Sequence, residues 1–230
     1  MRNATIAAWR KWLNVLDYNM EIIPSILTTT ENEFTEQLAA MNLAPINAVH
    51  IDITDGIFVP KQTFTSPEIT QNILQQSGCE LHLMVADPLA VLPLWAEVPN
   101  VIRVLFHYET GVDVTKVAEA IHEQGWEAGL VLNPETPIDV IEPLLEHLDT
   151  VMFMGVIPGS QGQTLIPQVL EKAYTCRQKY PDLYLEWDGD VTEETLPHII
   201  NTGVDAVCPG HAVFGAGDPV ENIVKLQNLI

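Results

Sequence analysis

His50-Ile51-Asp52-Ile53-Thr54-Asp55-Gly56 is the stretch of sequence that decides the fold, because it reads as the end of a buried strand running into a loop. In an extended strand successive side chains point to opposite faces. His50 and Asp52 therefore share one face, and Ile51 and Ile53 share the other. A histidine and a carboxylate on one face of an otherwise apolar strand need partners, because burying an unpaired charge is costly.

Two further polar residues, His82 and Asp188, lie in later apolar runs. Taken alone, a histidine in an apolar strand is more often a satisfied core residue, and Asp-Gly after a strand is most often a turn. A hydrogen bond between His50 and Asp52 would explain that pair nearly as well as metal binding. All four residues, however, fall at the same end of a strand in a repeating strand–helix pattern. We therefore predict that His50, Asp52, His82 and Asp188 converge on one divalent metal ion.

Composition indicates one large domain. The chain has 230 residues, of which 47% are hydrophobic and 18% charged, enough for a single large core. Its three cysteines, Cys79, Cys176 and Cys208, are far apart, so neither a disulfide framework nor a zinc–thiolate site is predicted. No apolar run approaches the roughly 18 residues of a membrane span, and the N-terminus lacks the apolar region of a signal peptide. We expect a cytoplasmic protein.

The net charge of −21, from 31 acidic and 10 basic residues, limits the kinds of molecule that the protein is expected to bind. Such a surface repels nucleic acids and anionic membranes, and neither is expected to bind. It also opposes an anionic substrate at long range, so a phosphate would have to be bound locally by backbone amides and helix N-termini. The simplest interpretation of the charge is a solvated surface.

Residues 1–20 predict an amphipathic helix. Its apolar residues recur at helical spacing, as Ile6, Trp9, Trp12, Leu13 and Leu16. This N-terminal helical extension could pack under a barrel or against another subunit of a homo-oligomer, and both alternatives stay open. Residues 21–230 are expected to form the catalytic domain.

From Glu21 onward strands and helices alternate regularly. The expected strands are 22–23, 47–53, 80–85, 101–106, 127–132, 150–155, 183–188 and 205–208. The expected helices are 31–42, 66–76, one beginning at Asp87-Pro88, 113–124, 136–147, 164–179, 192–201 and 218–228. Eight such units with nearly continuous apolar strands predict an α/β fold, a single closed (β/α)8 TIM barrel. Active sites of such barrels lie at the carboxyl ends of the strands.

Several motifs lie at these strand ends. They are Pro24-Ser25-Ile26-Leu27, the stretch from His50 to Pro60, His82-Leu83-Met84, Phe106-His107-Tyr108-Glu109, Leu132-Asn133-Pro134 with Thr136-Pro137, Pro158-Gly159 with Gly162-Gln163, and Asp188-Gly189. Together they resemble the pentulose-phosphate 3-epimerase family, typified by ribulose-phosphate 3-epimerase, over about residues 21–228. The resemblance implies an isomerase of the pentose phosphate type, acting on a small-molecule sugar or sugar phosphate.

The resemblance also implies roles for particular residues. His50, Asp52, His82 and Asp188 would hold the metal, with Asp52 and Asp188 facing each other across the substrate as catalytic base and acid. The substrate-binding residues that it implies are Ser25, Met84, Met154, Gly159, Gly162, Gly189, Gly210 and His211.

The residue types suit this chemistry on physical grounds. Epimerising the carbon next to a ketone requires removal of a proton from one face and return of a proton to the other. A metal bound to both substrate oxygens stabilises the enediolate, and two carboxylates on opposite faces supply the proton transfers. Two histidines and two carboxylates suit Zn²⁺, Fe²⁺, Mn²⁺ or Co²⁺, and the absence of cysteine argues against a structural zinc site.

The departures from the family's usual sequence cluster where it binds phosphate. Gly-Phe-Gly-Gly-Gln is here Gly159-Ser160-Gln161-Gly162-Gln163, Asp-Gly-Gly is Asp188-Gly189-Asp190, and Gly-Ser is Gly210-His211. Glycine permits close approach of backbone amides to phosphate, whereas a carboxylate at Asp190 repels it unless it points away. His211 could donate to the phosphate if protonated, or fill its pocket. These changes predict weak use of ribulose 5-phosphate.

Three alternatives to a ketose-phosphate epimerase follow. The same metal centre could epimerise a non-phosphorylated or differently substituted sugar, as Asp190 and His211 suggest. A non-catalytic sugar-binding paralogue is opposed by the presence of all four ligands. A Schiff-base aldolase is disfavoured, because no lysine ends a predicted barrel strand and Lys61 lies in a loop.

Overall fold

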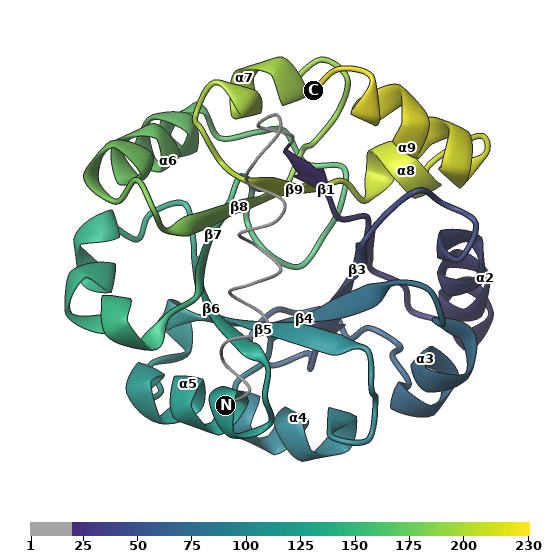
Figure 1. Ribbon diagram of the computed structural model, residues 1–230, viewed down its shortest axis with the longest axis horizontal. Helices are drawn as coiled ribbons and strands as arrows, with labels where there is room; N and C mark the ends of the chain where they lie inside the picture. The colour runs from purple at the N-terminus through teal and green to yellow at the C-terminus, as the bar shows by residue number, and fades with distance from the viewer. Residues whose placement is uncertain (1–19) are drawn as a thin grey trace.

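The computed structural model describes residues 20–230, and in this part of the chain nine parallel strand segments curl into a barrel surrounded by helices (Figure 1). The strands are β1 Glu21–Ile22, β2 Ser25–Ile26, β3 Ala48–Thr54, β4 Gly78–Met84, β5 Val101–His107, β6 Glu127–Leu132, β7 Thr150–Met154, β8 Tyr184–Asp188 and β9 Ala206–Cys208. The predicted α/β barrel is confirmed. The helix predicted over residues 1–20 lies, apart from its last residue, outside the described residues.

The barrel closes through its first strand, which is divided at Pro24. β1 pairs with β9, whereas β2 pairs with β3 on the other side. Between them, the Ile23 N–H donates to the Val207 carbonyl at 2.9 Å, and the His50 N–H donates to the Pro24 carbonyl at 2.9 Å. β1 and β2 therefore share one of eight positions around the barrel.

The helices cover the outside of the barrel. They are α2 Glu31–Met41, α3 Pro67–Ile73, α4 Pro88–Trp95, α5 Val114–Glu123, α6 Pro167–Lys179, α7 Leu196–Ile200, α8 His211–Phe214 and α9 Pro219–Gln227, with 3-10 helices η1 Tyr108–Thr110 and η2 Ile138–His147. Thr30 and Asp87 cap α2 and α4, since their side chains accept the N–H groups of Glu33 and Ala90. Between residues 20 and 230, no helix has the length and apolar character needed to cross a membrane.

Two expected helices differ from the structure, and one helix of the structure is not among those expected. The 136–147 segment is the 3-10 helix η2 rather than an α-helix, and Pro143 inside it has no N–H for an α-helical hydrogen bond. α7 begins at Leu196 instead of residue 192, because Thr192 and Thr195 exchange backbone-to-side-chain hydrogen bonds of 3.0 and 3.2 Å in a turn. The four-residue α8 is too short to have a periodic sequence signal.

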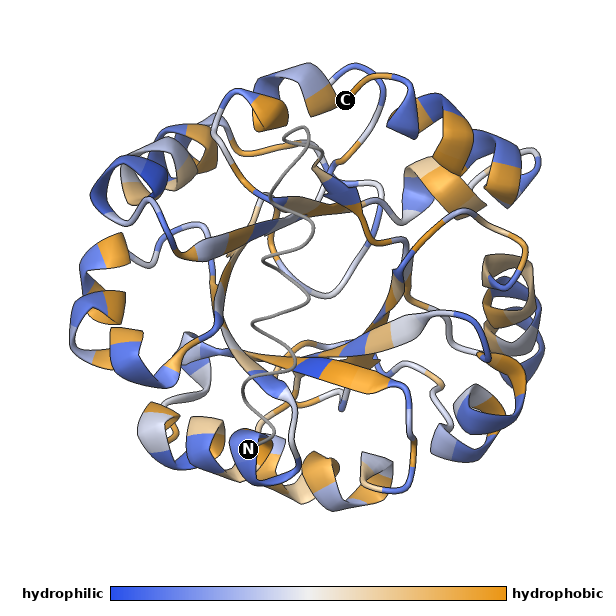
Figure 2. Ribbon diagram, in the orientation of Figure 1, coloured by the Kyte–Doolittle hydropathy of each residue, from blue (hydrophilic) through white to orange (hydrophobic). Residues whose placement is uncertain are grey.

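The two faces of the sheet differ in chemistry. Outward-facing strand residues pack with the helices in the main hydrophobic core; they include Val49, Ile51, Leu81, Leu83, Phe106, Leu130, Phe153 and Trp187. Figure 2 shows the matching pattern on the helices, which are apolar toward the sheet and hydrophilic outside. The inner face instead carries buried polar side chains, among them His50, Asp52, Glu80, His82, Arg103, His107 and Glu186. The helix–sheet layer thus holds the barrel together, and its interior is free to carry chemistry.

Candidate active site

The four predicted metal ligands lie together at one end of the barrel interior. His50 and Asp52 come from β3, His82 from β4 and Asp188 from the end of β8. One ligand atom from each lies within 4.8 Å of the others. Asp52 Oδ1 is 2.8 Å from His82 Nδ1 and 3.4 Å from His50 Nε2, and Asp188 Oδ2 is 3.7 Å from His82 Nδ1.

Strand alternation and register explain this convergence. His50 and Asp52 are two residues apart in β3 and share its inner face. Asp52 pairs with His82 in the neighbouring strand, which places the carboxylate beside the imidazole. β8 lies across the barrel from β3 and β4 (Figure 1), and its last residue, Asp188, brings its carboxylate into the same group of ligand atoms.

One nitrogen of each histidine is turned toward the carboxylates and the other is held elsewhere. His50 Nε2 is buried and has no hydrogen-bond partner, whereas His50 Nδ1 lies 2.6 Å from Glu80 Oε1. His82 Nδ1 faces Asp52, and its Nε2 lies 2.9 Å from His107 Nε2. An unpaired buried nitrogen beside two carboxylates and a second imidazole is the donor set of a divalent transition metal.

The two carboxyl groups have pKa values on opposite sides of the ordinary range. Burial favours a higher pKa for Asp52, but the nearby imidazole of His50 and the hydrogen bond and charge of His82 outweigh it and hold this pKa well below its usual value. Burial and then the charge of Asp52 raise the pKa of Asp188 to about 7. Near neutral pH, one group is a carboxylate and the other can carry a proton, which is a typical division into base and acid.

The two imidazoles also differ. Burial lowers the pKa of His82 to about 4, so its ring is neutral at pH 7 and can act as a ligand. Burial would lower the pKa of His50 as well, but the nearby carboxylate of Asp52 and the hydrogen bond and charge of Glu80 raise it well above the usual value. A metal at His50 Nε2 would displace a proton, as metals generally do on binding.

A cavity of about 220 Å³ opens above these residues. Asp52 and Asp188 line it, and so does every predicted substrate-binding residue: Ser25, Met84, Met154, Gly159, Gly162, Gly189, Gly210 and His211. The structure therefore brings together all the residues singled out from the sequence, with His50 and His82 below the cavity. The two methionines are buried and form an apolar part of its wall.

Comparison with known proteins agrees with this arrangement. The sequence profile of the ribulose-phosphate 3 epimerase family matches residues 21–214. The chain is 34% identical over 212 residues to the ribulose-phosphate 3-epimerase of Mycobacterium leprae, covering 90% of this chain and 93% of that protein. It is 32% identical over 216 residues to that of Bacillus subtilis, covering 90% and 98%. The chain belongs to the ribulose-phosphate 3-epimerase family. The predicted enzyme class, an isomerase of the epimerase type, is thereby confirmed.

Solved structures confirm the fold more widely. KGPDC from Streptococcus mutans superposes with a TM-score of 0.69 at 11% identity, over 91% of this chain and 96% of that chain. The 3-hexulose-6-phosphate synthase from Salmonella typhimurium superposes with a TM-score of 0.67 at 16% identity, over 91% and 98%. At such low identity the likeness shows the barrel alone.

Asp190, which departs from the usual sequence of the ribulose-phosphate 3-epimerase family, joins two loops. Its backbone φ of 50° lies in the left-handed region that favours glycine. Its Oδ2 accepts the Leu165 N–H at 2.8 Å, which connects the loop after β8 to the segment before α6. The carboxylate is therefore neither an isolated charge nor simply turned to solvent, as the sequence alone would allow.

A second departure, Gln161, fills space at the same end of the cavity. Its Nε2 donates to the Ser25 carbonyl at 3.3 Å, and a Cβ on Gly210 would lie only 2.0 Å from that nitrogen. No lysine or arginine is among the described residues that line the cavity. A phosphate there would meet backbone amides and His211 rather than a fixed positive charge.

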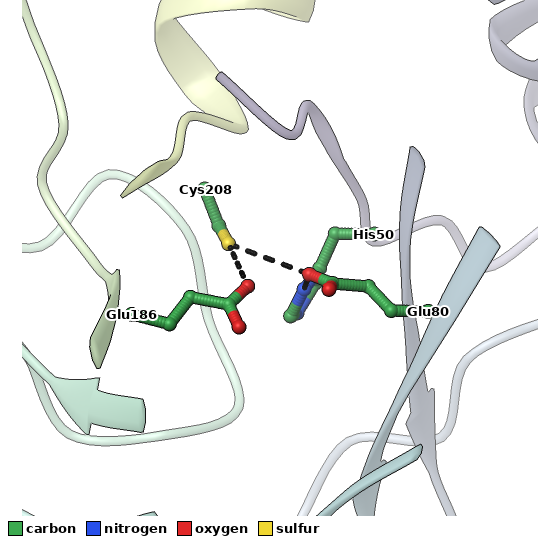
Figure 3. A group of neighbouring side chains, drawn as sticks. All are labelled: His50, Glu80, Glu186 and Cys208. Atoms are coloured by element: carbon green, nitrogen blue, oxygen red, sulfur yellow. Dashed lines mark hydrogen bonds and ion pairs between the residues drawn. The ribbon is translucent and has the colours of Figure 1, made fainter. Parts of the chain in front are cut away.

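Some polar residues behind the site carry no motif that singles them out in the sequence. Glu80, Glu186 and Cys208 form a buried group with His50 (Figure 3). Burial favours a higher pKa for Glu80, but the hydrogen bond of His50 and the charge of Arg103 lower it to about 2. Burial and the Glu80 charge raise the pKa of Glu186 well above its usual value. Only the shared strand face of Glu80 and His82 could have pointed to this group.

The raised pKa of Asp188 predicts a pH-dependent stability of the metal-free protein. Between pH 4 and 7 the unfolded chain has released this proton while the folded chain retains it, so stability falls as pH rises. Asp188→Asn should remove this loss and stabilise the metal-free protein near pH 8 by about 2–4 kcal/mol, at about 1.4 kcal/mol per pK unit. Urea unfolding at about pH 5 and pH 8 in the presence of a chelator measures the effect. The exposed Asp182→Asn is the control, and equal pH dependence in both variants would contradict the prediction.

Proposed function

We propose that the protein is a metal-dependent ketose-phosphate 3-epimerase, with ribulose 5-phosphate or a related sugar phosphate as substrate. The observation that carries the proposal is the pair Asp52 and Asp188 in one cavity, with pKa values shifted in opposite directions, beside the unpaired His50 Nε2. The names of the relatives supply the reaction, and the pair supplies the acid and base that it needs.

The chemistry is a proton transfer at the carbon next to the ketone. When bound by His50, Asp52, His82 and Asp188, a divalent ion such as Zn²⁺, Fe²⁺, Mn²⁺ or Co²⁺ would supply Lewis-acid stabilisation of the negative charge on the substrate oxygens. Asp52, ionised and desolvated, removes the proton from one face. Asp188, which can carry a proton at neutral pH, returns one to the other face. In the reverse reaction the two carboxyls exchange roles.

The wall of the cavity supports this chemistry in two ways. Met84 and Met154 are apolar and buried, so they exclude water from the reacting carbon and lower the dielectric around the developing charge. Ser25 begins β2 and pairs with His50 in the neighbouring strand β3, where its hydroxyl can contact substrate oxygens or a water.

The end of the cavity lined by Gly159 to Gln163, Gly189-Asp190 and Gly210-His211, called the distal end below, would receive the phosphate. Gly159, Gly162 and Gly189 have positive φ values of 107°, 75° and 113°, which turn the loops after β7 and β8 so that backbone amides can be presented to an anion. A Cβ at Gly189 would lie 2.7 Å from Val156, so the turn accepts no larger residue.

A second candidate substrate is a sugar without phosphate. Asp190 places a carboxylate at the distal end, Gln161 occupies part of it, and no lysine or arginine of the described residues lines the cavity. Amide and hydroxyl groups of this kind bind neutral hydroxyls well. Only the distal end distinguishes the two candidates, since the acid–base chemistry is the same.

The metal proposal predicts one divalent ion per chain. His82→Gln should weaken binding of that ion by more than about 100-fold, exceeding the 10–100-fold effects typical of residues behind the ligands. Elemental analysis and chelator competition on reconstituted protein measure it. His122→Gln, a histidine bonded to Asp149 at the surface, is the matched control and should bind normally. Equal affinities would exclude His82 as a ligand.

The acid–base proposal predicts that Asp52→Asn and Asp188→Asn each lower kcat by about 10²–10⁴-fold or more when kcat is measured at saturating metal. In D₂O the wild type should incorporate solvent deuterium at the epimerised carbon, which mass spectrometry or NMR detects. Turnover with no exchange at that carbon, after internal proton return has been tested, would rule out deprotonation.

The distal loops predict a poor KM for ribulose 5-phosphate in the wild type. Asp190→Asn keeps an oxygen that can accept the Leu165 N–H and removes the negative charge. Two unit charges 4 Å apart interact by roughly 4 kcal/mol at a dielectric of about 20, and solvent screens part of this repulsion. KM for the phosphorylated sugar should therefore fall about 10-fold in this variant. Asp190→Gly with His211→Ser should show a further fall if the glycine turn alone suffices.

KM for the unphosphorylated sugar is the control and should not change in Asp190→Asn. A wild type that already turns over ribulose 5-phosphate as efficiently as a dedicated enzyme would show that Asp190 does not oppose the phosphate.

A further inference from the structure

A second polar group lies inside the barrel, behind the four proposed metal ligands. Its members are His50, Glu80, Glu186 and Cys208, on strands β3, β4, β8 and β9 (Figure 3). All four are at most 1% exposed. His50 belongs to both groups, and so it connects the cavity to this deeper layer.

The deeper group is an ion-pair network rather than a second metal site. Arg103 Nη1 lies 2.7 Å from Glu80 Oε2 and 3.3 Å from Glu186 Oε2. The guanidinium of Arg103 therefore already supplies the positive charge that a metal ion would bring to these carboxyl groups. The Cys208 thiol donates to Glu186 Oε1 at 3.2 Å. A divalent ion placed among these groups would face the guanidinium, and like charges in a low-dielectric interior repel strongly.

Glu80 is the member that contacts the proposed ligand His50 directly. Its Oε1 lies 2.6 Å from His50 Nδ1, and its Oε2 is held by Arg103. Arg103 is in turn fixed by Glu127, whose Oε2 accepts from Nε at 3.0 Å and from Nη2 at 2.9 Å. Both oxygens of the Glu80 carboxylate are therefore anchored, and the carboxylate can neither rotate nor move away from the imidazole.

We propose that Glu80, anchored by Arg103, is a positioning residue that fixes the ring and tautomer of His50, so that Nε2 faces the carboxylates of Asp52 and Asp188. A half-turn of the ring about its bond to Cβ would exchange the two edges of the imidazole, and the Glu80 contact opposes it. A carboxylate on the remote nitrogen of a ligating histidine also increases the basicity of the ligating nitrogen. This inference rests on the proposed function, since it assumes that His50 is a ligand.

The two histidines of the site are supported differently. His82 Nε2 lies 2.9 Å from another imidazole, His107, which contacts Glu109 at 3.3 Å near the surface. His50 instead meets a carboxylate directly, in the deepest part of the barrel. Glu80 therefore supplies a direct charge to one ligand that the other ligand lacks.

The test is metal affinity of the full-length protein. Glu80→Gln keeps the size of the side chain but replaces the charged acceptor, so affinity for Zn²⁺ or Co²⁺ should fall 10–100-fold, the range typical of residues behind metal ligands. The visible absorption spectrum of the Co²⁺-substituted variant should also change, because the orientation and basicity of one ligand change.

Glu127→Gln is the matched control. It makes the same chemical change in the same network and removes a charge from Arg103, but Glu127 is separated from His50 by Arg103 and Glu80. Its Co²⁺ spectrum and metal affinity should match those of the wild type. If Glu80→Gln does not fold, Glu80→Gln with Arg103→Met removes both charges of the pair and tests the same affinity.

The outcomes separate this inference from the proposed function. Wild-type affinity and an unchanged Co²⁺ spectrum in Glu80→Gln would show that Glu80 only stabilises the fold, and overturn the inference. Two ions per chain in the wild type, one of them lost in Glu80→Gln, would make Glu80 a ligand and overturn it too. Metal binding that depends on Glu80 in a protein without epimerase activity would support the inference while the proposed function fails. A wild type that binds no divalent ion would overturn both.

Discussion

The balance of charge inside the closed barrel is the constraint on which the rest of the structure depends. The inner face is walled by strands on every side, so each ionised group there must be neutralised by another protein group. Asp52 meets two imidazoles, and Arg103 meets the carboxylates of Glu80, Glu127 and Glu186. Glu186 and Asp188 are not balanced in this way: burial and the charges of Glu80 and Asp52, respectively, raise the pKa of each carboxyl group.

The stability that this interior requires comes from the outer layer. The strand residues facing the helices are fully buried aliphatic and aromatic side chains, each contributing on the order of 1.5–3 kcal/mol by removal from water. The barrel can therefore tolerate the loss of folding stability that the raised pKa of Asp188 causes at neutral pH. The same raised pKa suits Asp188 to the acid role proposed for it, so this proposed role and its cost to folding have one physical cause.

The sequence predicts much of the site because strand alternation is a local property. His50 and Asp52 are two residues apart in an apolar strand, and that spacing alone places them on one face. The Glu80–Arg103 pair could not be predicted in this way, because it depends on a change of register. Cys79 pairs with Val101, but Glu80 pairs with Arg103, so that Ile102 is passed over at a bulge and is 41% exposed. Without the bulge, Arg103 would pair one position further along β4 and face the helices.

The loops are where sequence reasoning is weakest, and they also form the end of the cavity on which the proposed choice of substrate depends. Glycine positions with positive φ are visible in the sequence, whereas the partner of a side chain such as Asp190 is set by two loops that meet only in the folded barrel. The proposed acid–base pair, Asp52 and Asp188, lies on the barrel strands β3 and β8 rather than in loops. Changes such as Gln161 and Asp190 can therefore alter the distal end of the cavity while the proton-transfer geometry stays constant. Because the two ends are built from different elements, a family member can change the group it binds at the far end of the sugar without losing the reaction at the near end.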